Sequence, residues 1–230
     1  VPLIVRAPWL PWAATTRGAA GGARAAALAE LVDIFPTMLE ALNASLVDPA
    51  FDQLDGTSLL PVLEAPADAA LASALKTYAL SQYMRCPANT SDAADYWEDN
   101  GCLQTDRTKI PFFGYTVRTA AWRYTAWFAW NATSLGPVWD ARFAEELYNH
   151  TRDDGRADFD LFENANEIES ADPAVLAQMR EVLREAVESQ ARLPGLDDHR
   201  RREARHLPRG RPVGRGPLPA PQLHRPRVAR

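Results

Sequence analysis

The sequence lacks long apolar runs and contains little cysteine or histidine. No apolar run reaches the ~18 residues that a membrane-spanning helix needs, so we expect no membrane span. The two cysteines and four histidines among the 230 residues show no zinc-ligand spacing. Two isolated cysteines do not complete a four-ligand site, which argues against structural zinc. We find no internal repeat.

The start of the chain is apolar and strand-like. The sequence begins with Val1 rather than Met and opens directly into VPLIV, and 47% of all residues are hydrophobic and 24% charged. That composition suffices for one or two cores. Because a domain rarely begins with a core strand at its first residue, we expect a fragment whose N-terminal part lies elsewhere.

Charge is divided unevenly along the chain. The net charge is −5, but residues 199–230 hold ten Arg and one acid, whereas residues 1–192 hold fifteen basic and twenty-seven acidic side chains. An Arg-, Pro- and Gly-rich segment without apolar periodicity cannot bury enough surface to offset its ordering entropy. We therefore predict a disordered basic tail over 193–230. Three alternatives are open for this tail. It is only solvated, it binds nucleic acid or acidic membrane, or it is sequence read through an unrecognised splice site or frame. The abrupt change after Arg192 favours the last of these.

Four Asn-x-Ser/Thr sequons occur in a chain with seven Asn and twenty-one Ser plus Thr. Chance would give about 0.6 under the acceptor rule. Each sequon lies near a predicted loop or element end, where a glycan fits. We predict glycosylation and a secreted or lysosomal protein, with coincidence as the alternative. The four acceptors are Asn43, Asn89, Asn131 and Asn149.

The two cysteines bound one polar stretch. Cys86 and Cys102 are sixteen residues apart, and Pro, Asn, Asp and Gly lie between them. Two such cysteines beside glycosylation signals predict a disulfide. Closing a loop of this length would stabilise the fold by about 3 kcal/mol in the chain-entropy model. Two unpaired thiols are the alternative.

Hydrophobic periodicity in the first part of the chain predicts a mixture of strands and helices. Pro36 falls inside a helical pattern, so we expect it to kink or divide that helix. The polar residues 86–111 are expected to form a loop. The predicted elements are a buried strand ending at Pro8, a helix from Ala25 to Leu42, a short helix over 58–65, a linker with helical tendency over 66–75, and a strand over 77–83.

The clearest pattern lies in the second part. Gly114 to Trp130 crowds aromatic and β-branched residues into two short runs, which predicts an antiparallel hairpin. A further strand is expected over 142–150. Asp172-Pro173 combines an N-cap residue with Pro at the first helical position, so a helix should run from there to about Gln190. Its apolar stripe, expected in the core, is Val175, Leu176, Met179, Val182, Leu183 and Val187.

Six segments taken together point to one family. VPLIVRAP, ELVDIFPTMLEAL, LDGTSLLPVL and SQYMRCP come first, followed by the hairpin GYTVRTAAWRYTAWFAWN and the run ELYNHTRDDGRADFDLFENAN. All six resemble segments of sulfatases, in the order of that family, over about residues 1–190. The SQY-CP and DDG-FD-FEN patterns most resemble the iduronate-2-sulfatase group. Members of that group act in the lysosomal breakdown of heparan and dermatan sulfate, and the resemblance implies the same role here.

The resemblance implies an α/β fold of the alkaline-phosphatase type. In that fold a large α/β domain carries the site, and a smaller C-terminal α+β subdomain carries a small antiparallel sheet with a long helix. By this analogy residues 1–65 are the end of the catalytic domain, 66–192 are the C-terminal subdomain, and 193–230 are the tail. The resemblance also accounts for Pro36, which lies where the family pattern has proline.

The chemistry that the resemblance implies lies outside this chain. Sulfatases use a formylglycine made from the Cys of C-x-P-x-R, and a Ca²⁺ held by hard oxygen ligands. Neither Cys86 nor Cys102 fits that motif, and no D-H-G motif is present. We therefore predict no catalytic and no metal-binding residue here. Asp153-Asp154 is interpreted as a solvated turn, and His150, inside a sequon, as exposed.

Supporting residues are the remaining candidates. In the resemblance, SQY-R lies on the side of the active-site cleft, so Gln82, Tyr83 and Arg85 are candidates for shaping a pocket for an anionic sugar. Arg85 has the chemistry to hold a carboxylate or sulfate through two hydrogen bonds. The alternative is that Tyr83 is hairpin core and Arg85 a surface charge. Arg118 and Arg123 are expected to pair with acids such as Glu145 or Glu146.

Three hypotheses of function follow. The first is the C-terminal part of a sulfatase, inactive alone, whose sulfated sugar substrate binds through a domain outside this chain; it has no specific nucleic-acid partner. The second is a non-catalytic glycan-binding or relic module that folds alone. The third is a nucleic-acid-binding protein that uses its Arg-rich tail, which salt-dependent binding would reveal.

Overall fold

The computed structural model describes residues 3–10, 22–43, 54–86, 102, 105–153, 155 and 161–191. The basic tail, most of the loop between the cysteines, and three of the four histidines lie outside the described residues. The same is true of Asn89 and Asp154, so the predictions made for them stay predictions. The division of the chain at residues 65 and 192 also stays a prediction.

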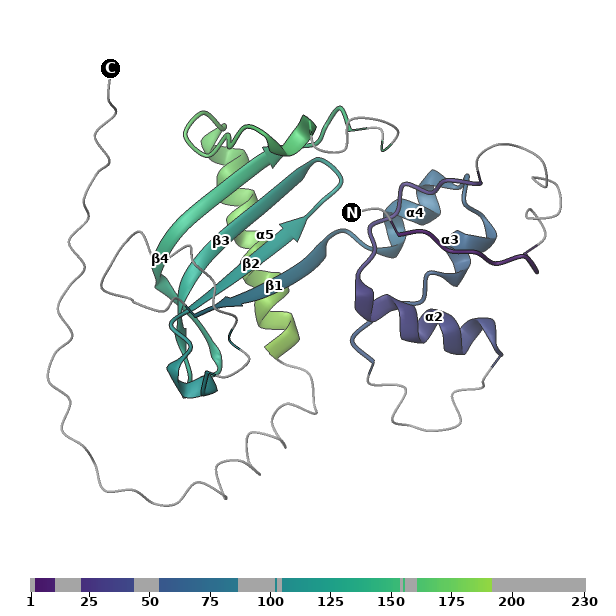
Figure 1. Cartoon of the computed structure of the whole chain (residues 1–230). Helices are drawn as coiled ribbons and strands as arrows, with labels where there is room; N and C mark the ends of the chain where they lie inside the picture. The colour runs from purple at the N-terminus through teal and green to yellow at the C-terminus, as the bar shows by residue number, and fades with distance from the viewer. Residues whose placement is uncertain are drawn as a thin grey trace, which may run out of the picture.

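A four-stranded antiparallel sheet forms the larger part of the fold (Figure 1). Its strands lie in chain order, so that each pairs with the next one along the sequence. The predicted hairpin is confirmed as β2 and β3, joined by a tight turn at residues 119–121. The strands are β1 (Ala79–Arg85), β2 (Phe112–Arg118), β3 (Trp122–Asn131) and β4 (Gly136–Asn149).

A long helix, α5 (Pro173–Ala191), covers one face of this sheet. The predicted start is confirmed, because Asp172 Oδ1 accepts a hydrogen bond of 2.8 Å from the Ala174 amide and Pro173 opens the first turn. The predicted stripe is confirmed as well, since all six of its residues belong to the core or pack against it. Met179 and Leu183 are buried there against alternate residues of the strands, which are Phe113, Tyr115, Val117, Tyr124, Ala126, Phe128 and Leu147.

Three short helices form a separate unit at the β1 side of the sheet (Figure 1). They are α2 (Ile34–Ala41), which follows a 3-10 turn η1 (Leu31–Asp33), α3 (Leu60–Glu64) and α4 (Ala69–Leu75). Asp68 caps α4 by accepting from the Leu71 amide at 2.9 Å. Together with the sheet and α5 these helices confirm the mixed α/β class, with a small antiparallel sheet and one long helix. Two further 3-10 turns are η5 (Arg107–Lys109) and η6 (Leu161–Glu163).

A buried carboxylate connects the helical unit to the sheet. Asp33 is fully buried, and its carboxylate accepts hydrogen bonds from the amides of Glu30 at 2.7 Å and Thr57 at 2.8 Å. Lys76 Nζ donates to both carboxylate oxygens at 2.8 Å and also pairs with Glu30. Glu30 in turn accepts from the amide of Leu80 in β1. The charge of Asp33 is thus paired and hydrogen-bonded, as burial requires.

Close backbone approach at the same place explains a glycine. A Cβ on Gly56 would overlap the backbone carbonyl of Val32, so a larger residue would push apart the two segments that Asp33 joins. Thr37 completes the contact, because its hydroxyl donates to the Asp33 carbonyl and accepts from the Leu59 amide at 2.8 Å. The segments 30–37 and 54–60 are therefore held by hydrogen bonds as well as by packing.

Two predictions for the N-terminal part are wrong. Residues 3–7 form no strand, and Ile4 is 88% exposed, because no described strand pairs with this segment. Residues 22–30 are not helical either, and α2 begins only at Ile34. Pro36 therefore lies in the first turn of α2, where the missing amide hydrogen costs nothing. The proline sets the start of the helix instead of dividing it.

The last strand is longer than predicted. β4 begins at Gly136 rather than near residue 142, and it pairs with β3 along the whole of that strand. The pairing is irregular on both sides of Phe128. Phe143 is left as an extra residue between the pairs Trp127–Ala144 and Phe128–Arg142, and residues 139–141 are left between Phe128–Arg142 and Ala129–Val138. Such a bulge breaks the two-residue period on which strand prediction depends.

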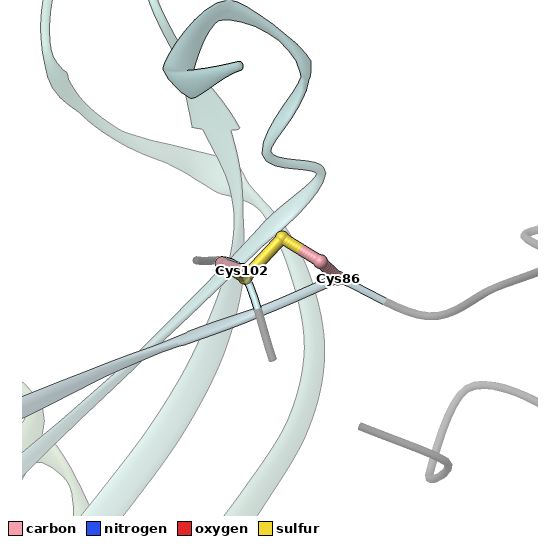
Figure 2. The surroundings of a disulfide bond; sticks show 2 residues. All are labelled: Cys86 and Cys102. Carbon is pink, nitrogen blue, oxygen red and sulfur yellow. A yellow bond between two sulfur atoms is a disulfide. The ribbon is translucent and has the colours of Figure 1, made fainter. Parts of the chain in front are cut away.

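The predicted disulfide between Cys86 and Cys102 is confirmed (Figure 2). The two Cα atoms are 5.3 Å apart. Cys86 directly follows β1, so the bond joins the end of this edge strand to the chain that leads into β2. Among the described helices, none combines the length and the apolarity that crossing a bilayer requires.

Replacing the buried carboxylate tests the connection at Asp33. We expect Asp33→Asn to lower the free energy of unfolding by about 3 kcal/mol, because it leaves the Lys76 ammonium with Glu30 alone. Urea unfolding followed by circular dichroism measures this. Asp55→Asn is the control, since Asp55 is an exposed carboxylate in the loop that contains Thr57. If both substitutions changed the free energy of unfolding by the same small amount, the role of Asp33 in connecting the helical unit to the sheet would be contradicted.

Hydrogen exchange tests the contrast between the two parts. The helical unit exposes large apolar side chains to solvent, among them Leu31 at 83%, Leu42 at 74% and Met38 at 56%. Each Å² of apolar surface left exposed loses about 25 cal/mol of stabilisation that burial would give. We expect fast amide exchange over 22–43 and 54–64, and strong protection over 112–130 and 174–190. Uniform strong protection of both parts would overturn this expectation.

Candidate functional site

Polar and aromatic side chains gather at three places on the sheet. We call the face opposite α5 the open face. The first place is this open face, the second is the end of the sheet near His150, and the third is the outer edge at β4.

The strand register separates the three predicted pocket residues. Gln82 pairs with Tyr115, whose side chain lies in the core under α5, whereas Tyr83 pairs with Gly114 and Arg85 with Phe112. Successive side chains of a strand point to opposite faces. Tyr83 and Arg85 therefore share the open face and Gln82 does not. Tyr83 is 55% exposed, so it does not lie in the hairpin core.

On the open face an arginine stacks on a tryptophan. The guanidinium carbon of Arg85 lies 5.0 Å from the centre of the Trp127 ring. That ring in turn covers Gly114, where an added Cβ would lie 2.6 Å from it. Glycine is therefore required at 114 for the indole to lie flat on the strand. The stack fixes Arg85, which is half-buried, as a cation held over an aromatic surface.

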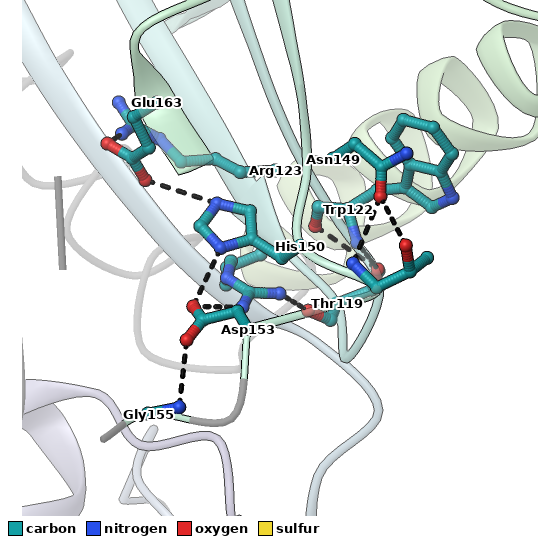
Figure 3. Close-up of polar contacts among 10 residues, drawn as sticks. Thr119, Trp122, Arg123, Asn149, His150, Asp153, Gly155 and Glu163 are labelled. Carbon is teal, nitrogen blue, oxygen red and sulfur yellow. Dashed lines mark hydrogen bonds and ion pairs between the residues drawn. The ribbon is translucent and has the colours of Figure 1, made fainter. Parts of the chain in front are cut away.

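Histidine and acids converge at the end of the sheet (Figure 3). His150, directly after β4, has Nδ1 at 2.9 Å from Asp153 Oδ2 and Nε2 at 3.3 Å from Glu163 Oε1. Arg118 Nη2 lies 3.7 Å from the same oxygen, Asp153 Oδ2, and Arg123 pairs with Glu163. The cluster joins β2, β3, the end of β4 and η6. Two cations and two carboxylates surround one imidazole, so the charges are balanced within the cluster.

The structure corrects two sequence predictions here. His150 is only 5% exposed, although it occupies the middle of a sequon, because the end of the sheet folds over it. Arg118 and Arg123 do pair with acids, but with Asp153 and Glu163 rather than Glu145 or Glu146. Both arginines lie at the turn end of the hairpin, whereas Glu145 lies further along β4 on the α5 face. The partner acids follow β4 in the sequence, and the sequence alone does not show that the chain returns there to the turn of the hairpin.

Hydrogen bonding sets the proton affinity of Asp153. The hydrogen bond with His150 lowers the pKa of its carboxyl below the ordinary value, burial acts in the opposite direction, and the Gly155 amide adds a second lowering contact. Burial lowers the pKa of Arg118, and the nearby Asp153 and Glu163 counteract this. The surroundings of Asp153 therefore favour the charged form of its carboxylate.

Glu145 is the centre of the third place. Its carboxylate accepts two hydrogen bonds from Arg180 of α5, at 2.8 and 2.7 Å, and one from the hydroxyl of the buried Tyr124. Arg142 Nε lies 3.2 Å from the same carboxylate. Burial raises the pKa of Glu145, but the donors Arg180, Tyr124 and Arg142 outweigh it and the net direction is downward. Burial, then the Glu145 contact, raises the pKa of Tyr124.

A hollow of about 250 Å³ lies beside this carboxylate. It is lined by Arg142, Phe143, Ala144 and Glu145 of β4 and by Ile168. Phe143 is the extra residue of the bulge, and it is half exposed. This place is not predictable from the sequence, because the two-residue period of a strand gives no sign of where a bulge falls.

The described sequon asparagines differ in exposure. Asn43 and Asn131 are exposed, whereas Asn149 is half-buried at the end of β4. The amide oxygen of Asn131 accepts from the Thr133 and Ser134 amides, and that of Asn149 accepts from both the amide and hydroxyl of Thr151. Asn131 therefore presents its side chain on a turn, as a glycan acceptor does. Glycosylation of all four stays a prediction.

The cysteines and the described clusters of acids are engaged with partners. Both cysteines of the sequence are in the disulfide, and each described cluster of acids is compensated by arginine or lysine. Across the ranges described above, no three His, Cys, Asp or Glu side chains are grouped as metal ligands would be. Arginines next to aromatic rings have the chemistry to hold an anionic ligand.

Comparison with known proteins gives limited matches. No family model matches the chain, and no curated protein matches it significantly. Among solved structures that match is BT1596, described as a 2-O GAG sulfatase, with 19% identity and a TM-score of 0.39. The alignment covers 76% of this chain and 26% of that one. The chain thus spans about a quarter of the length of that sulfatase.

The lowered pKa of Asp153 gives a pH dependence. Its contribution to stability is fully present above about pH 4, the ordinary range of aspartate, and is lost as the pH falls through the lower value of the folded state. We therefore expect Asp153→Asn to destabilise the protein at pH 7, and this effect to shrink progressively as the pH falls below about 4. Urea unfolding between pH 7 and pH 3 measures it. Asp140→Asn, at an exposed position of β4, is the control and should show no such convergence.

Proposed function

We propose that this chain is the C-terminal part of a sulfatase that acts on sulfated glycosaminoglycan-type sugars. In this proposal the nucleophile and the calcium site belong to a part of the enzyme outside these residues. The chain supplies a structural subdomain and one wall of the substrate cleft. Lysosomal or secreted location and glycosylation belong to the same proposal, and they rest on the sequons.

One observation carries the proposal: the segments that resemble sulfatases are the ones that contact each other. Asp33 of the ELVD segment binds the Thr57 amide of the LDGT segment, and Gly56 of that segment touches the Val32 carbonyl. Glu30 of the first segment then binds the Leu80 amide, next to the SQY segment. Contacts between five of the six weak sequence patterns would not be expected if their order were coincidence.

Three matching segments around the sheet are also in contact with one another. Gly114 of the hairpin lies under Trp127 of the same hairpin, and Arg85 of the SQY-R segment stacks on that ring. Arg123 of the hairpin pairs with Glu163 of the FEN segment. The residues that define the resemblance are therefore contact residues, which supports a common fold rather than a common composition.

A non-catalytic glycan-binding module is the second candidate. It is favoured by the open face, where Tyr83 is exposed and Arg85 is held over Trp127. Aromatic surfaces beside arginine suit an anionic sugar. The two candidates differ in whether the same transcript encodes a sulfatase active site.

Sequencing the transcript that contains this reading frame decides between them. We expect an upstream C-x-P-x-R motif and a calcium-binding aspartate pair in the same frame. Their absence from a complete transcript would leave the binding module. The same experiment shows whether the frame of residues 193–230 continues that of the preceding exon.

The chain alone should not hydrolyse sulfate esters, because it offers no cysteine for a formylglycine. Purified protein incubated with a fluorogenic sulfate should give the same signal as a mock preparation from the same host. The double variant Cys86→Ser, Cys102→Ser serves as the matched control for contaminating activity. Turnover by the chain that the double variant lacks would overturn the proposal.

A further inference from the structure

His150 has a fixed place at the end of the sheet. Its backbone amide donates to the Ala121 carbonyl at 2.8 Å, and its carbonyl accepts from the Asp153 amide at 3.0 Å. The Phe162 ring of η6 lies with its centre 5.9 Å from that of the imidazole. Because the side chain is only 5% exposed, a change in its charge acts on the groups around it and is little screened by water.

The two ring nitrogens of His150 face carboxylates from two different segments (Figure 3). Nδ1 lies 2.9 Å from Asp153 Oδ2, in the turn after β4, and Nε2 lies 3.3 Å from Glu163 Oε1, in η6. A neutral imidazole has one N–H and a protonated one has two. We assign the proton of the neutral form to Nδ1, because its contact with a carboxylate is the shorter one and lowers the pKa of Asp153.

Protonation changes the contact at Nε2. In the neutral form the lone pair of Nε2 faces a carboxylate oxygen, and this nitrogen is buried without a hydrogen-bond partner. Such an unsatisfied atom lowers the stability of a fold. A proton on Nε2 turns the same contact into a charge-assisted hydrogen bond to Glu163 Oε1. The other oxygen of that carboxylate, Oε2, is the partner of Arg123, so Oε1 is left for the imidazole.

The charges around His150 act in both directions. The carboxylates favour the protonated imidazole, because they contact its two nitrogens directly. The guanidinium groups oppose it, but those nearest to it are bound to the same carboxylates, which separate them from the ring nitrogens. The described charged or titratable groups at this place are Asp153 after β4, Glu163 of η6, Arg118 of β2, Arg123 of β3, Tyr148 under Arg123, and Arg24 at the Gly155 carbonyl.

We propose that His150 is a pH-dependent clamp, which on protonation binds Glu163 through Nε2 and fastens η6 to the end of the sheet. Histidine ordinarily changes its charge between about pH 5 and pH 8. In an acidic compartment Glu163 is therefore held by Arg123 and His150, and at neutral pH by Arg123 without His150. Because the added hydrogen bond exists only in the protonated form, its stabilisation is present at low pH and is lost as the pH rises. The inference rests on the geometry of this cluster and not on the sulfatase proposal.

The protonation state of the ring is the first measurement. Long-range ¹H–¹⁵N NMR spectra of the full chain, labelled with ¹⁵N-histidine, distinguish a protonated ring nitrogen from a bare one. The signals of His150 are identified among those of the four histidines by their change in Glu163→Gln. We expect Nδ1 to carry a proton at pH 5 and at pH 7.5, and Nε2 only at pH 5. An Nε2 that is bare at both pH values, or protonated at both, would overturn the proposal.

Hydrogen exchange measures the clamp itself. The Glu167 amide, just after η6, donates to the Leu147 carbonyl of β4 at 2.8 Å and reports whether this segment stays on the sheet. After correction for the intrinsic pH dependence of exchange, we expect its protection to be about tenfold higher at pH 5 than at pH 7.5. Equal protection at the two pH values, or weaker protection in acid, would show that protonation does not fasten η6.

A pair of variants separates the clamp from other effects of acid. Glu163→Gln removes the charge that Nε2 binds and should abolish the tenfold difference. The loss of the Arg123 ion pair is common to both pH values, so it does not imitate this result. Glu169→Gln is the matched control, because it makes the same change at an exposed carboxylate nearby and should keep the difference. These variants leave the buried His150 in place, so folding is not endangered there. A full difference in Glu163→Gln would refute the clamp.

Discussion

The connection between the two parts of this fold depends on one buried ion pair. Asp33 and Lys76 are both inaccessible or nearly so, and the carboxylate collects two backbone amides besides the ammonium. A buried charge is expensive unless it is fully paired, so the 30–37 segment, the loop at Thr57 and the approach to β1 are held in one arrangement. Packing in the helical unit would not achieve this alone, since many of its apolar side chains face solvent.

The sheet depends on a different kind of stabilisation. Its α5 face is an apolar layer of alternating residues, with Tyr124, Leu147 and Leu183 fully buried. A carboxylate, Glu145, joins this layer to the helix from its edge, where Arg180 reaches it without becoming buried itself. The open face, in contrast, is stabilised by stacking of Arg85, Trp127 and Gly114. The two faces therefore tolerate different substitutions. On the α5 face the volume of the side chain matters, and on the open face the close approach of the Trp127 ring to the backbone at Gly114 matters.

The hairpin and α5 could be predicted from the sequence because their signals are local. Aromatic alternation and the Asp172-Pro173 start need no knowledge of distant residues. Residues 3–7 show the opposite case, since an apolar run becomes a strand only when a partner strand is present. The family resemblance puts Gln82, Tyr83 and Arg85 together on the side of the cleft, but in a pleated strand Gln82 lies on the opposite face from Tyr83 and Arg85. The burial of His150 depends on Glu163 and Asp153 returning over the turn, which no local pattern encodes.

The disulfide has a consequence for the integrity of the chain. Cys86 ends the edge strand, and Cys102 lies on the approach to β2, so the bond bridges the covalent path between the helical unit and the rest of the sheet. If a protease cut the chain between these cysteines, the two pieces would still be one molecule, because the sulfur–sulfur bond would carry the continuity that the peptide bond had lost. Such a nicked protein would run as a single band without reducing agent and as two bands with it. The edge strand would keep its place in the sheet, held from its C-terminal end.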